Sequence, residues 1–300
     1  MPRGLRLLGL DIGGSRSRAR LCADGAVTDA AAPSASVTAA GPERARAALR
    51  ALFAGLRLDP AEPVDAICAG TAGLSVCGAR EFLLEQLAPL ARPGAVTIVS
   101  DAALVLPAAG LATGIAVISG TASVAVGTDG SRSIQAGGWG YLLGDEGGGY
   151  WIVREALRVL LGRRDQGSAV GELGTALMSA AGAADIATLQ GQFYEQPHYP
   201  RHWARLAPLV LTSSDPVAAD IAVRAAGALA ALAAAAAQEL DAPAGIPVVL
   251  AGGLMANAAF ASAACAAVRV ALPDAAVRVL QAEPVTGAIR LAARAARPTA

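Results

Sequence analysis

Residues 5–15 read LRLLGLDIGGS, an apolar run that ends in an aspartate and a pair of glycines. Such a run is typical of a buried strand, and the glycines favour a tight loop after it. Glycine lets the backbone bend and brings bare N–H groups close to a phosphate. We therefore predict a strand over Leu5–Leu10 and a phosphate-binding loop at Gly13, Gly14 and Ser15. Asp11 would hold Mg²⁺ through the water shell of the ion, although an ordinary turn between two strands remains the alternative.

The pattern of strand, small-residue loop and second strand returns in the second half of the chain. Ile115–Ser119 is a predicted strand, SGTAS over 119–123 is the loop, and Val124–Val126 continues as a strand. A third loop, Gly252-Gly253, follows the predicted strand Val248–Leu250 and leaves room for a flat ring such as adenine. We expect a duplicated α/β architecture with domains at 1–105 and 106–283 and a cleft between them. A closing helix, 284–298, would pack back on the first domain.

The order of these three loops resembles the sugar kinase/actin/Hsp70 superfamily. Residues 136–152, AGGWGYLLGDEGGGYWI, are similar to the signature segment of N-acetylglucosamine kinases in the BadF/BadG/BcrA/BcrD ATPase family. The resemblance runs from Leu8 to Ala292 and is weakest over Gly162–Ser214. It implies two ribonuclease H-like, actin-like ATPase domains, the use of ATP and Mg²⁺, and phosphorylation of the 6-hydroxyl of N-acetylglucosamine.

The resemblance also assigns roles to individual residues. Asp101, after the predicted strand Val96–Val99, falls at the position of the carboxylate that accepts the proton of the sugar hydroxyl. The nucleotide would be bound by Asp11, Gly13, Gly14, Ser15, Gly120, Thr121, Gly252 and Gly253. The sugar would be bound by Ser123, Trp139, Gly140, Tyr141 and Asp145.

Several of these residues have structural alternatives. Trp139 is also a candidate core residue, because large aromatic side chains are mostly buried. Asp145 is also a candidate cap for a helix that begins near Gly147, and Asp101 for the segment after it. Ala122 stands where the family has a second glycine, and it would cost about 1 kcal/mol if the position needs a positive φ. The segment Ser34–Ser36 lacks the asparagine that often contacts the sugar.

Three other functions remain open from the sequence. Glucosamine is the main rival substrate. An ATPase that activates radical dehydratases would bind an iron–sulfur cluster through cysteines, but Cys22, Cys68, Cys77 and Cys265 form no CxxC pair. A sugar-binding sensor without catalysis is the third. Because no helix-turn-helix precedes Leu5, we do not expect a DNA-binding form of such a sensor.

Composition excludes several classes of protein. The chain has 24 basic and 24 acidic residues, no lysine and zero formal net charge, which argues against nucleic-acid binding. Its apolar segments are too short or too rich in alanine to predict a membrane span, so we expect a cytoplasmic protein. The resemblance makes a homodimer possible. His198 and His202 lie in a proline-broken segment that predicts a polar loop better than a metal pair, and Arg16 or Arg18 could lie near ATP.

Overall fold

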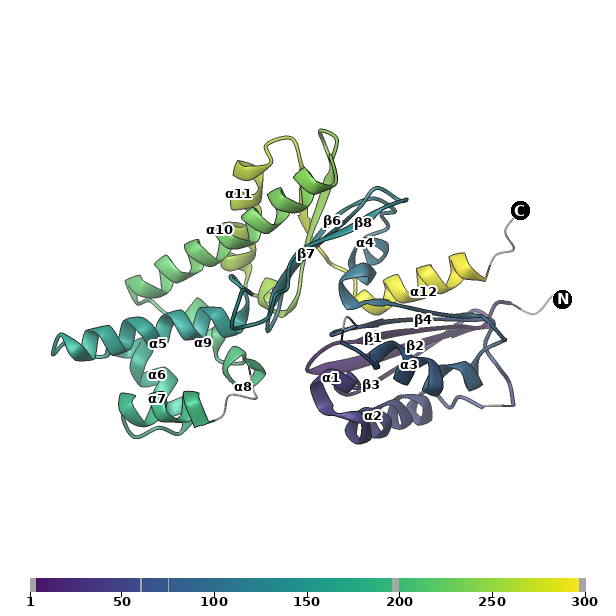
Figure 1. Ribbon diagram of the computed structural model, residues 1–300, viewed down its shortest axis with the longest axis horizontal. Coiled ribbons are helices and arrows are strands. Elements are labelled where there is room, and N and C mark those ends of the chain that lie inside the picture. Colours follow the sequence, from purple (N-terminus) through teal and green to yellow (C-terminus); the bar gives the residue numbers. More distant parts are fainter. Residues whose placement is uncertain (1–3, 60, 75, 196–199, 297–300) are drawn as a thin grey trace. The chain divides into compact units, whose positions relative to one another are not determined.

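The computed structural model describes residues 4–59, 61–74, 76–195 and 200–296. Contacts divide the chain into two compact units, which are described separately (Figure 1). Unit 1 comprises the chain up to Ala112 together with the segment from Leu280 onward, and unit 2 comprises Thr113–Val279. The chain therefore leaves unit 1 once and returns to it at the end.

Unit 1 is built on a five-stranded mixed sheet in the order β3-β2-β1-β4-β5. The strands are β1 (Leu7–Ile12), β2 (Arg16–Ala23), β3 (Ala26–Pro33), β4 (Ala66–Thr71) and β5 (Val96–Ser100). β1 pairs antiparallel with β2 and parallel with β4, and β4 pairs parallel with β5. The carboxyl ends of β1, β4 and β5 therefore meet at one edge of the sheet.

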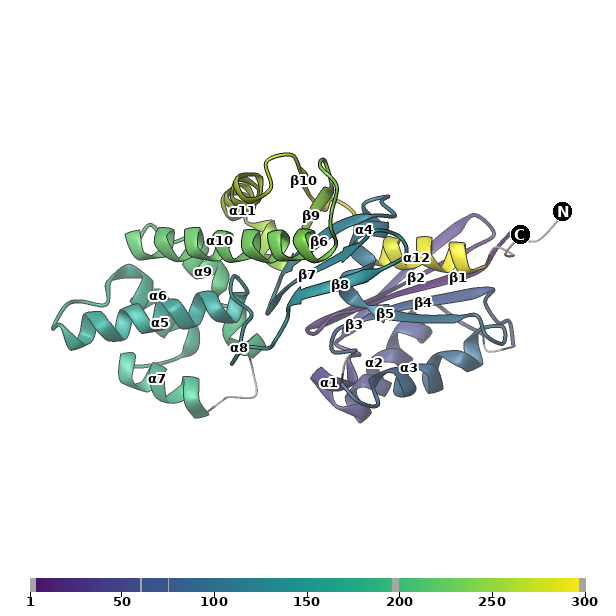
Figure 2. The same ribbon diagram turned by 45° about the horizontal axis from the view of Figure 1, so that its top comes forward.

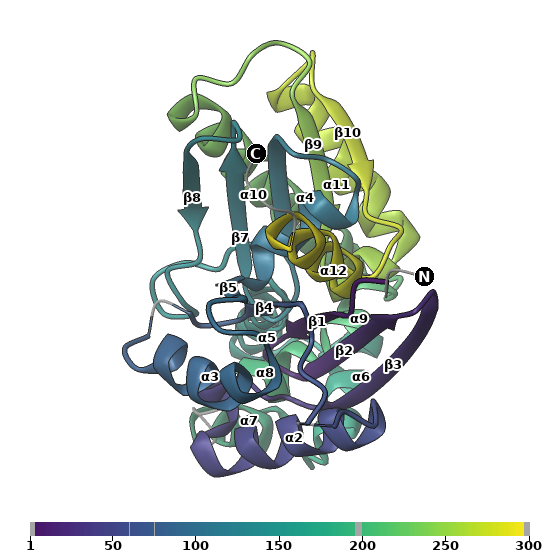
Figure 3. The same cartoon turned by 90° about the vertical axis from the view of Figure 1, so that its right-hand side faces the viewer.

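Helices cover both faces of this sheet. One face buries Leu8, Leu10 and Ile12 against α2 (Pro42–Gly55) and α3 (Ala79–Leu87), and α1 (Val37–Ala40) precedes α2. The other face packs against α12 (Pro284–Ala295), as Figure 3 shows, and α4 (Val105–Ala108) packs in turn against α12. A Cβ on Gly9 would lie 2.9 Å from the backbone nitrogen of Ile289, so this glycine lets α12 approach β1 closely.

Unit 2 repeats the strand arrangement of unit 1. Its strands are β6 (Gly114–Ser119), β7 (Ser123–Thr128), β8 (Ser133–Gly137), β9 (Pro247–Ala251) and β10 (Ala276–Val279). They lie in the order β8-β7-β6-β9-β10, and β6 pairs antiparallel with β7 and parallel with β9. Each strand of unit 2 therefore holds the same place in its sheet as the corresponding strand of unit 1, which confirms the duplicated α/β fold.

A helical insertion separates β8 from β9 in unit 2 (Figure 2). It contains α5 (Gly149–Asp165), α6 (Gly171–Ala181), α7 (Ile186–Glu195), α8 (Pro200–Ala204), α9 (Ala207–Leu211) and α10 (Pro216–Glu239). Pro216 begins α10, and the Asp215 side chain caps it by accepting a hydrogen bond from the Val217 N–H at 3.0 Å. In the described part of the chain, α10 alone is long and apolar enough to span a membrane. It packs on β6, β7 and β8 as a core helix instead.

Two helical segments follow β9. Gly253–Ala256 forms a 3-10 turn, and α11 (Ala258–Ala271) begins after it. The side chain of Asn257 accepts a hydrogen bond from the Phe260 N–H at 2.9 Å. This cap starts a new helix, since an asparagine at the N-cap position satisfies an N–H of the first turn.

Candidate functional site

Two carboxylates lie together at the edge of the unit 1 sheet. Asp11 is near the end of β1 and Asp101 directly follows β5, which is separated from β1 only by β4. Burial and the neighbouring charge of Asp101 raise the pKa of Asp11 to about 7. Burial also raises the pKa of Asp101, whose Oδ1 accepts a hydrogen bond from the Ala102 N–H at 3.0 Å. A cation at this edge would relieve the repulsion between the two groups.

An ion pair flanks these carboxylates. Arg18 lies directly across from Asp11 in the β1–β2 register, and its guanidinium pairs with Glu283. After burial and Asp101, Arg18 is the next influence on the pKa of Asp11 and lowers it, while Glu283 raises it. Sequence reasoning considered Arg18 but missed Glu283, because a contact across 265 residues leaves no local signal.

The first glycine loop is held by serines of a neighbouring segment. Ser34 donates its hydroxyl to the carbonyl oxygen of Gly13 at 2.9 Å. Ser36 donates to the carbonyl oxygen of Ala72, beyond β4, at 3.0 Å. Both serines are buried, whereas Ser15 at the loop tip is exposed. The segment that lacks the family's asparagine therefore supports two loops at this edge of the sheet.

The carboxylates of unit 1 fit a magnesium ion bound together with phosphate. Mg²⁺ is usually held by one or two carboxylates, with phosphate oxygens and water as the other ligands. No cluster of three or more His, Cys, Asp or Glu side chains that could hold a metal occurs among the described residues. Asp11 and the neighbouring Asp101 supply the one or two carboxylates that this mode of binding requires.

In unit 2, the second glycine loop and the segment 145–150 are joined by hydrogen bonds. The hydroxyl of Ser119 donates to the carbonyl oxygen of Gly147 at 2.7 Å, and that of Ser123 donates to Glu146 at 2.6 Å. In return, the N–H of Gly149 donates to Gly120 at 2.8 Å and that of Tyr150 donates to Thr121 at 3.2 Å. The first turn of α5 and the glycine loop therefore form one rigid element.

Ala122 fits this loop without backbone strain. It does not adopt a positive φ, so the cost considered for an alanine at this position does not arise. Its neighbour across the loop is Gly148, where a Cβ would lie 2.7 Å from the carbonyl carbon of Ala122. The glycine that makes room here is in the signature segment instead of the loop.

Asp145 presents a buried carboxylate in the signature segment. The residue is 6% exposed and adopts a left-handed backbone with φ 62°. Its Oδ1 is buried and has no hydrogen-bond partner within the described chain. Burial raises the pKa of Asp145, and the backbone N–H groups of Gly140 and Ser123 oppose that rise. The helix-cap alternative is wrong, because Gly148 is the N-cap residue of α5 and no side chain caps that helix.

Trp139 and Tyr141 lie on the loop that leads to Asp145. Trp139 is 71% exposed, so its assignment as a core residue is wrong. The Tyr141 ring meets the Tyr150 ring edge-on, with centroids 5.2 Å apart. Gly140 has φ 87° and its carbonyl oxygen accepts hydrogen bonds from Leu143 and Gly144. The loop therefore offers an exposed indole face next to a compact turn.

The third glycine loop lies against the second, because β9 pairs with β6. Gly252 has φ 103°, and a Cβ there would overlap the carbonyl oxygen of Ser119. Gly253 faces open space. The structure thus brings Gly120, Thr121, Ser123, Gly252 and Gly253 to one edge of the unit 2 sheet.

The remaining histidine and cysteine predictions concern residues outside these clusters. His198 lies outside the described residues. His202 packs edge-on to the Trp203 ring at 5.1 Å, and burial, with a smaller contribution from Arg205, lowers its pKa. Cys68 is buried under α12, and burial raises its pKa to about 12, whereas Cys77 is exposed. These two thiols therefore occupy different surroundings.

Comparisons with known proteins agree with this architecture. The BadF/BadG/BcrA/BcrD ATPase family matches the chain over residues 8–292. A protein of Clostridium acetobutylicum named N-acetylmuramic acid/N-acetylglucosamine kinase is 39% identical over 103 residues. That match spans 33% of this chain and 33% of the Clostridium protein.

Solved structures share the fold over nearly the whole chain. A candidate N-acetylglucosamine kinase from Chromobacterium violaceum has a TM-score of 0.75 and 27% identity, covering 96% of this chain and 99% of its own. One from Porphyromonas gingivalis has a TM-score of 0.73 and 18% identity, covering 96% and 98%. A glucokinase of the ROK family from Streptomyces griseus has a TM-score of 0.59 and 16% identity, covering 96% and 98%.

Proposed function

Because the chain belongs to the BadF/BadG/BcrA/BcrD ATPase family, we propose that it is an ATP-dependent sugar kinase that phosphorylates the 6-hydroxyl of N-acetylglucosamine. The names of the relatives from Clostridium and Chromobacterium support this acceptor. The Clostridium name also includes N-acetylmuramic acid, which shares the N-acetylated ring. Glucosamine is the alternative acceptor without the acetyl group.

In this proposal Asp101 is the general base. Its carboxylate accepts the proton of the sugar hydroxyl while the hydroxyl oxygen forms a bond to the γ-phosphorus. The bond between that phosphorus and the β–γ bridging oxygen breaks, and ADP leaves with the electron pair. A positioned base contributes about 10²–10⁴-fold to the rate of such a transfer. The raised pKa of Asp101 suits it to take up a proton during the reaction.

The glycine loops bind the nucleotide. Backbone N–H groups at Gly13, Gly14, Gly120 and Thr121, with the hydroxyl of Ser15, bind phosphate oxygens, and Gly252 and Gly253 accept the adenosine. Asp11 would hold Mg²⁺ through its water shell, and the ion would offset the charge of the phosphates. The carboxyl edge of each sheet is where open α/β folds bind their ligands.

The signature segment binds the sugar. Asp145 accepts hydrogen bonds from ring hydroxyls through its free Oδ1, and the exposed Trp139 face packs on sugar C–H groups. Gly140 and Tyr141 shape the loop between them. The backbone N–H of Ser123 faces the Asp145 carboxylate, so Ser123 would contribute to binding the same sugar.

The single observation that carries the proposal is the pairing of Asp11 and Asp101. Burial, and after it the neighbouring charge of Asp101, raise the pKa of Asp11 to about 7, so keeping this carboxylate ionised is costly to the fold. Such pairs are typical of functional sites, where a cation or a transferred proton uses them. We expect the reaction to take place in the cytoplasm, and a homodimer is a further expectation of the family resemblance.

Assaying ADP release from Mg·ATP with a panel of sugars tests the proposal. The panel contains N-acetylglucosamine, N-acetylmuramic acid, glucosamine and glucose, and phosphorus NMR of the product locates the phosphate. We expect N-acetylglucosamine to have the highest kcat/KM and the phosphate to appear at the 6-position. Sugar-independent ATP hydrolysis, or sugar binding with no ADP, would overturn the kinase assignment.

A further inference from the structure

Helix α5 contacts the loop 138–147 at Tyr141 in two different ways. Tyr150 and Arg154 are four residues apart on α5, so both project from the same face of the helix. The Tyr150 ring packs against the Tyr141 ring, and Arg154 Nη1 donates to the Tyr141 carbonyl oxygen at 3.4 Å. The side chain and the backbone of Tyr141 are therefore both restrained by α5.

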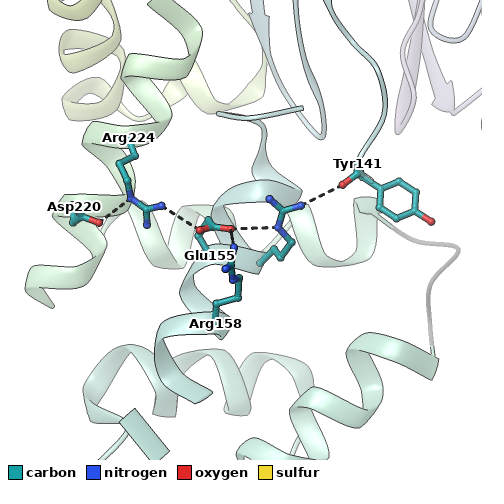
Figure 4. Close-up of polar contacts among 6 residues, drawn as sticks. Tyr141, Glu155, Arg158, Asp220 and Arg224 are labelled. Atoms are coloured by element: carbon teal, nitrogen blue, oxygen red, sulfur yellow. Dashed lines mark hydrogen bonds and ion pairs between the residues drawn. The ribbon is translucent and has the colours of Figure 1, made fainter. Parts of the chain in front are cut away.

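Arg154 is itself held by Glu155. Glu155 lies at the centre of a small ion-pair network (Figure 4). The Glu155 side chain is 9% exposed, and its Oε1 lies 3.4 Å from Arg154 Nε and 3.3 Å from Arg158 Nη1. Burial raises the pKa of Glu155, but the arginines outweigh it and the net shift is downward. Glu155 is therefore a stable anion that can orient the guanidinium of Arg154.

The other oxygen of Glu155 connects the network to α10. Arg224 Nη1 lies 3.1 Å from Glu155 Oε2, and its Nε lies 2.9 Å from Asp220 Oδ2. The Arg224 guanidinium also lies over the Trp151 ring, 5.4 Å from the centroid. Two core helices thus fix Glu155, and the position of Arg154 follows from the packing of α5 against α10.

The restrained peptide lies within the turn that presents Asp145. Tyr141 follows Gly140, whose carbonyl oxygen accepts hydrogen bonds from Leu143 at 3.2 Å and Gly144 at 2.8 Å. The N–H of Gly140 lowers the pKa of Asp145, against the dominant effect of burial, so it faces that carboxylate. Movement of the Tyr141 peptide would therefore move the groups around Asp145.

We propose that Arg154, oriented by Glu155, is a positioning residue that holds the loop 138–147 in the conformation that binds the sugar. The inference rests on the proposed function for the identity of the ligand, but the restraint on the loop does not. Arg158 provides a matched comparison, because it pairs with the same oxygen of Glu155, its side chain is 71% exposed, and within the described chain it makes no hydrogen bond or ion pair with the loop.

The test compares Arg154→Ala with Arg158→Ala in the full chain. For Arg154→Ala we expect about a tenfold rise in the KM for N-acetylglucosamine, the scale of one hydrogen bond to a charged group. The KM for ATP should stay within about twofold, because the hydrogen bonds of Arg154 among the described residues go to Glu155 and Tyr141 and not to the nucleotide loops. Arg158→Ala should leave both constants within about twofold. Equal effects of the two variants on the sugar KM would overturn the proposal.

Hydrogen exchange separates this inference from the proposed function. Without any ligand, amides of 138–147 should exchange at least about fivefold faster in Arg154→Ala than in Arg158→Ala. Trp139 reports on the same loop, because it is exposed while Trp151 and Trp203 are buried. Quenching of its fluorescence by acrylamide should therefore differ between Arg154→Ala and Arg158→Ala. If no sugar is phosphorylated by the parent protein, the kinase proposal fails while the exchange result still decides this one.

Two further variants guard against misfolding. Glu155→Gln keeps the shape of the side chain and removes its charge, and it should raise the sugar KM in the same direction as Arg154→Ala. Arg154→Lys keeps the charge but lacks the planar guanidinium that bonds Glu155 and the Tyr141 carbonyl at the same time. We therefore expect its sugar KM to lie between those of the parent protein and Arg154→Ala. Unchanged loop exchange in both variants would contradict the positioning role.

Discussion

The hydroxyl of Ser123 donates a hydrogen bond of 2.6 Å to the carbonyl oxygen of Glu146. Ser123 begins β7 and is fully buried, whereas Glu146 follows Asp145 in the signature segment. The proposed phosphate loop and the proposed sugar segment are therefore fixed to each other by side-chain chemistry. Loss of the Ser123 hydroxyl should therefore release the signature segment at Glu146.

Replacing Ser123 with alanine should loosen the signature segment. The change leaves the Glu146 carbonyl without its donor, which costs about 1–3 kcal/mol of unfolding free energy where the group stays buried. We expect a higher sugar KM and faster hydrogen exchange over residues 145–148. Thr128→Val is the control, because Thr128 makes a similar hydroxyl-to-carbonyl bond at the other, exposed end of β7. Equal sugar constants for the two variants would contradict the prediction.

Asp101→Asn should separate binding from chemistry. An asparagine keeps the size of the side chain but cannot accept the hydroxyl proton, so kcat should fall about 10²–10⁴-fold. Sugar affinity, measured by calorimetry, should stay within about threefold. The control is Glu85→Gln, a conservative change of an exposed carboxylate on α3. Unchanged turnover in Asp101→Asn would remove this residue from the mechanism.

Gly287→Ala should disturb the catalytic edge of unit 1 from a distance. A Cβ at this position in α12 would overlap the carbonyl oxygen of Leu104, which ends the 3-10 turn beginning at Asp101. We expect a loss of about 2 kcal/mol or more in unfolding free energy, as for other changes that force backbone apart. Turnover should fall as well, because the turn carrying Asp101 must shift.

Gly227→Ala is the matched control for that substitution. It lies in the middle of α10, and a Cβ there would meet nothing within 4 Å. Alanine has a higher helix propensity than glycine, so the variant should gain about 0.5–1 kcal/mol of stability. Urea unfolding of both variants gives the comparison, and similar destabilisation of the two would show that the close approach at Gly287 is not what matters.

Asp215 should make the stability of unit 2 sensitive to acid. Its side chain is 8% exposed, accepts from Arg163 at 2.7 and 2.8 Å, and caps α10. Hydrogen bonding from Arg163 lowers the pKa of Asp215 below its ordinary value of 3.8. The stabilisation is therefore fully present above 3.8 and is lost as the pH falls through the lowered value.

Urea unfolding of the parent protein and Asp215→Asn checks this pH dependence. Above pH 5 the variant should be less stable by about 2–3 kcal/mol, because Arg163 loses its charged partner. The difference should shrink as the pH falls toward 3. Asp241→Asn, which changes a largely exposed carboxylate, should show no such convergence. A difference that is constant across this pH range would contradict the assignment.

The local patterns of the sequence were sufficient for the architecture. Apolar runs ending in Asp11, Ser119 and Ala251 predicted three strands with glycine loops, and all three strands are present as β1, β6 and β9. The closing helix predicted over 284–298 is likewise present as α12 (Pro284–Ala295). These features depend on the preferences of neighbouring residues, which a sequence displays directly.

Local patterns could not decide which large or polar side chains are buried. Trp139 is exposed and Asp145 is buried. The usual preferences of the two residue types are the reverse, because tryptophan is mostly buried and aspartate mostly exposed. Asn257 similarly starts α11 through a single side-chain hydrogen bond, within a segment that is otherwise mostly apolar. Each outcome depends on the surrounding packing, which alternation and propensity do not contain.

The sequence by itself determined the repeated pattern of strand, loop and strand, the three glycine loops and the family to which the chain belongs. The tertiary structure alone decided which charges face each other. Asp11 meets Asp101 and Glu283, and Arg224 reaches Glu155, across long stretches of chain. The physical reason is that hydrogen bonds and charge interactions act over a few ångströms in space, so their partners are set only when the sheets and helices have packed.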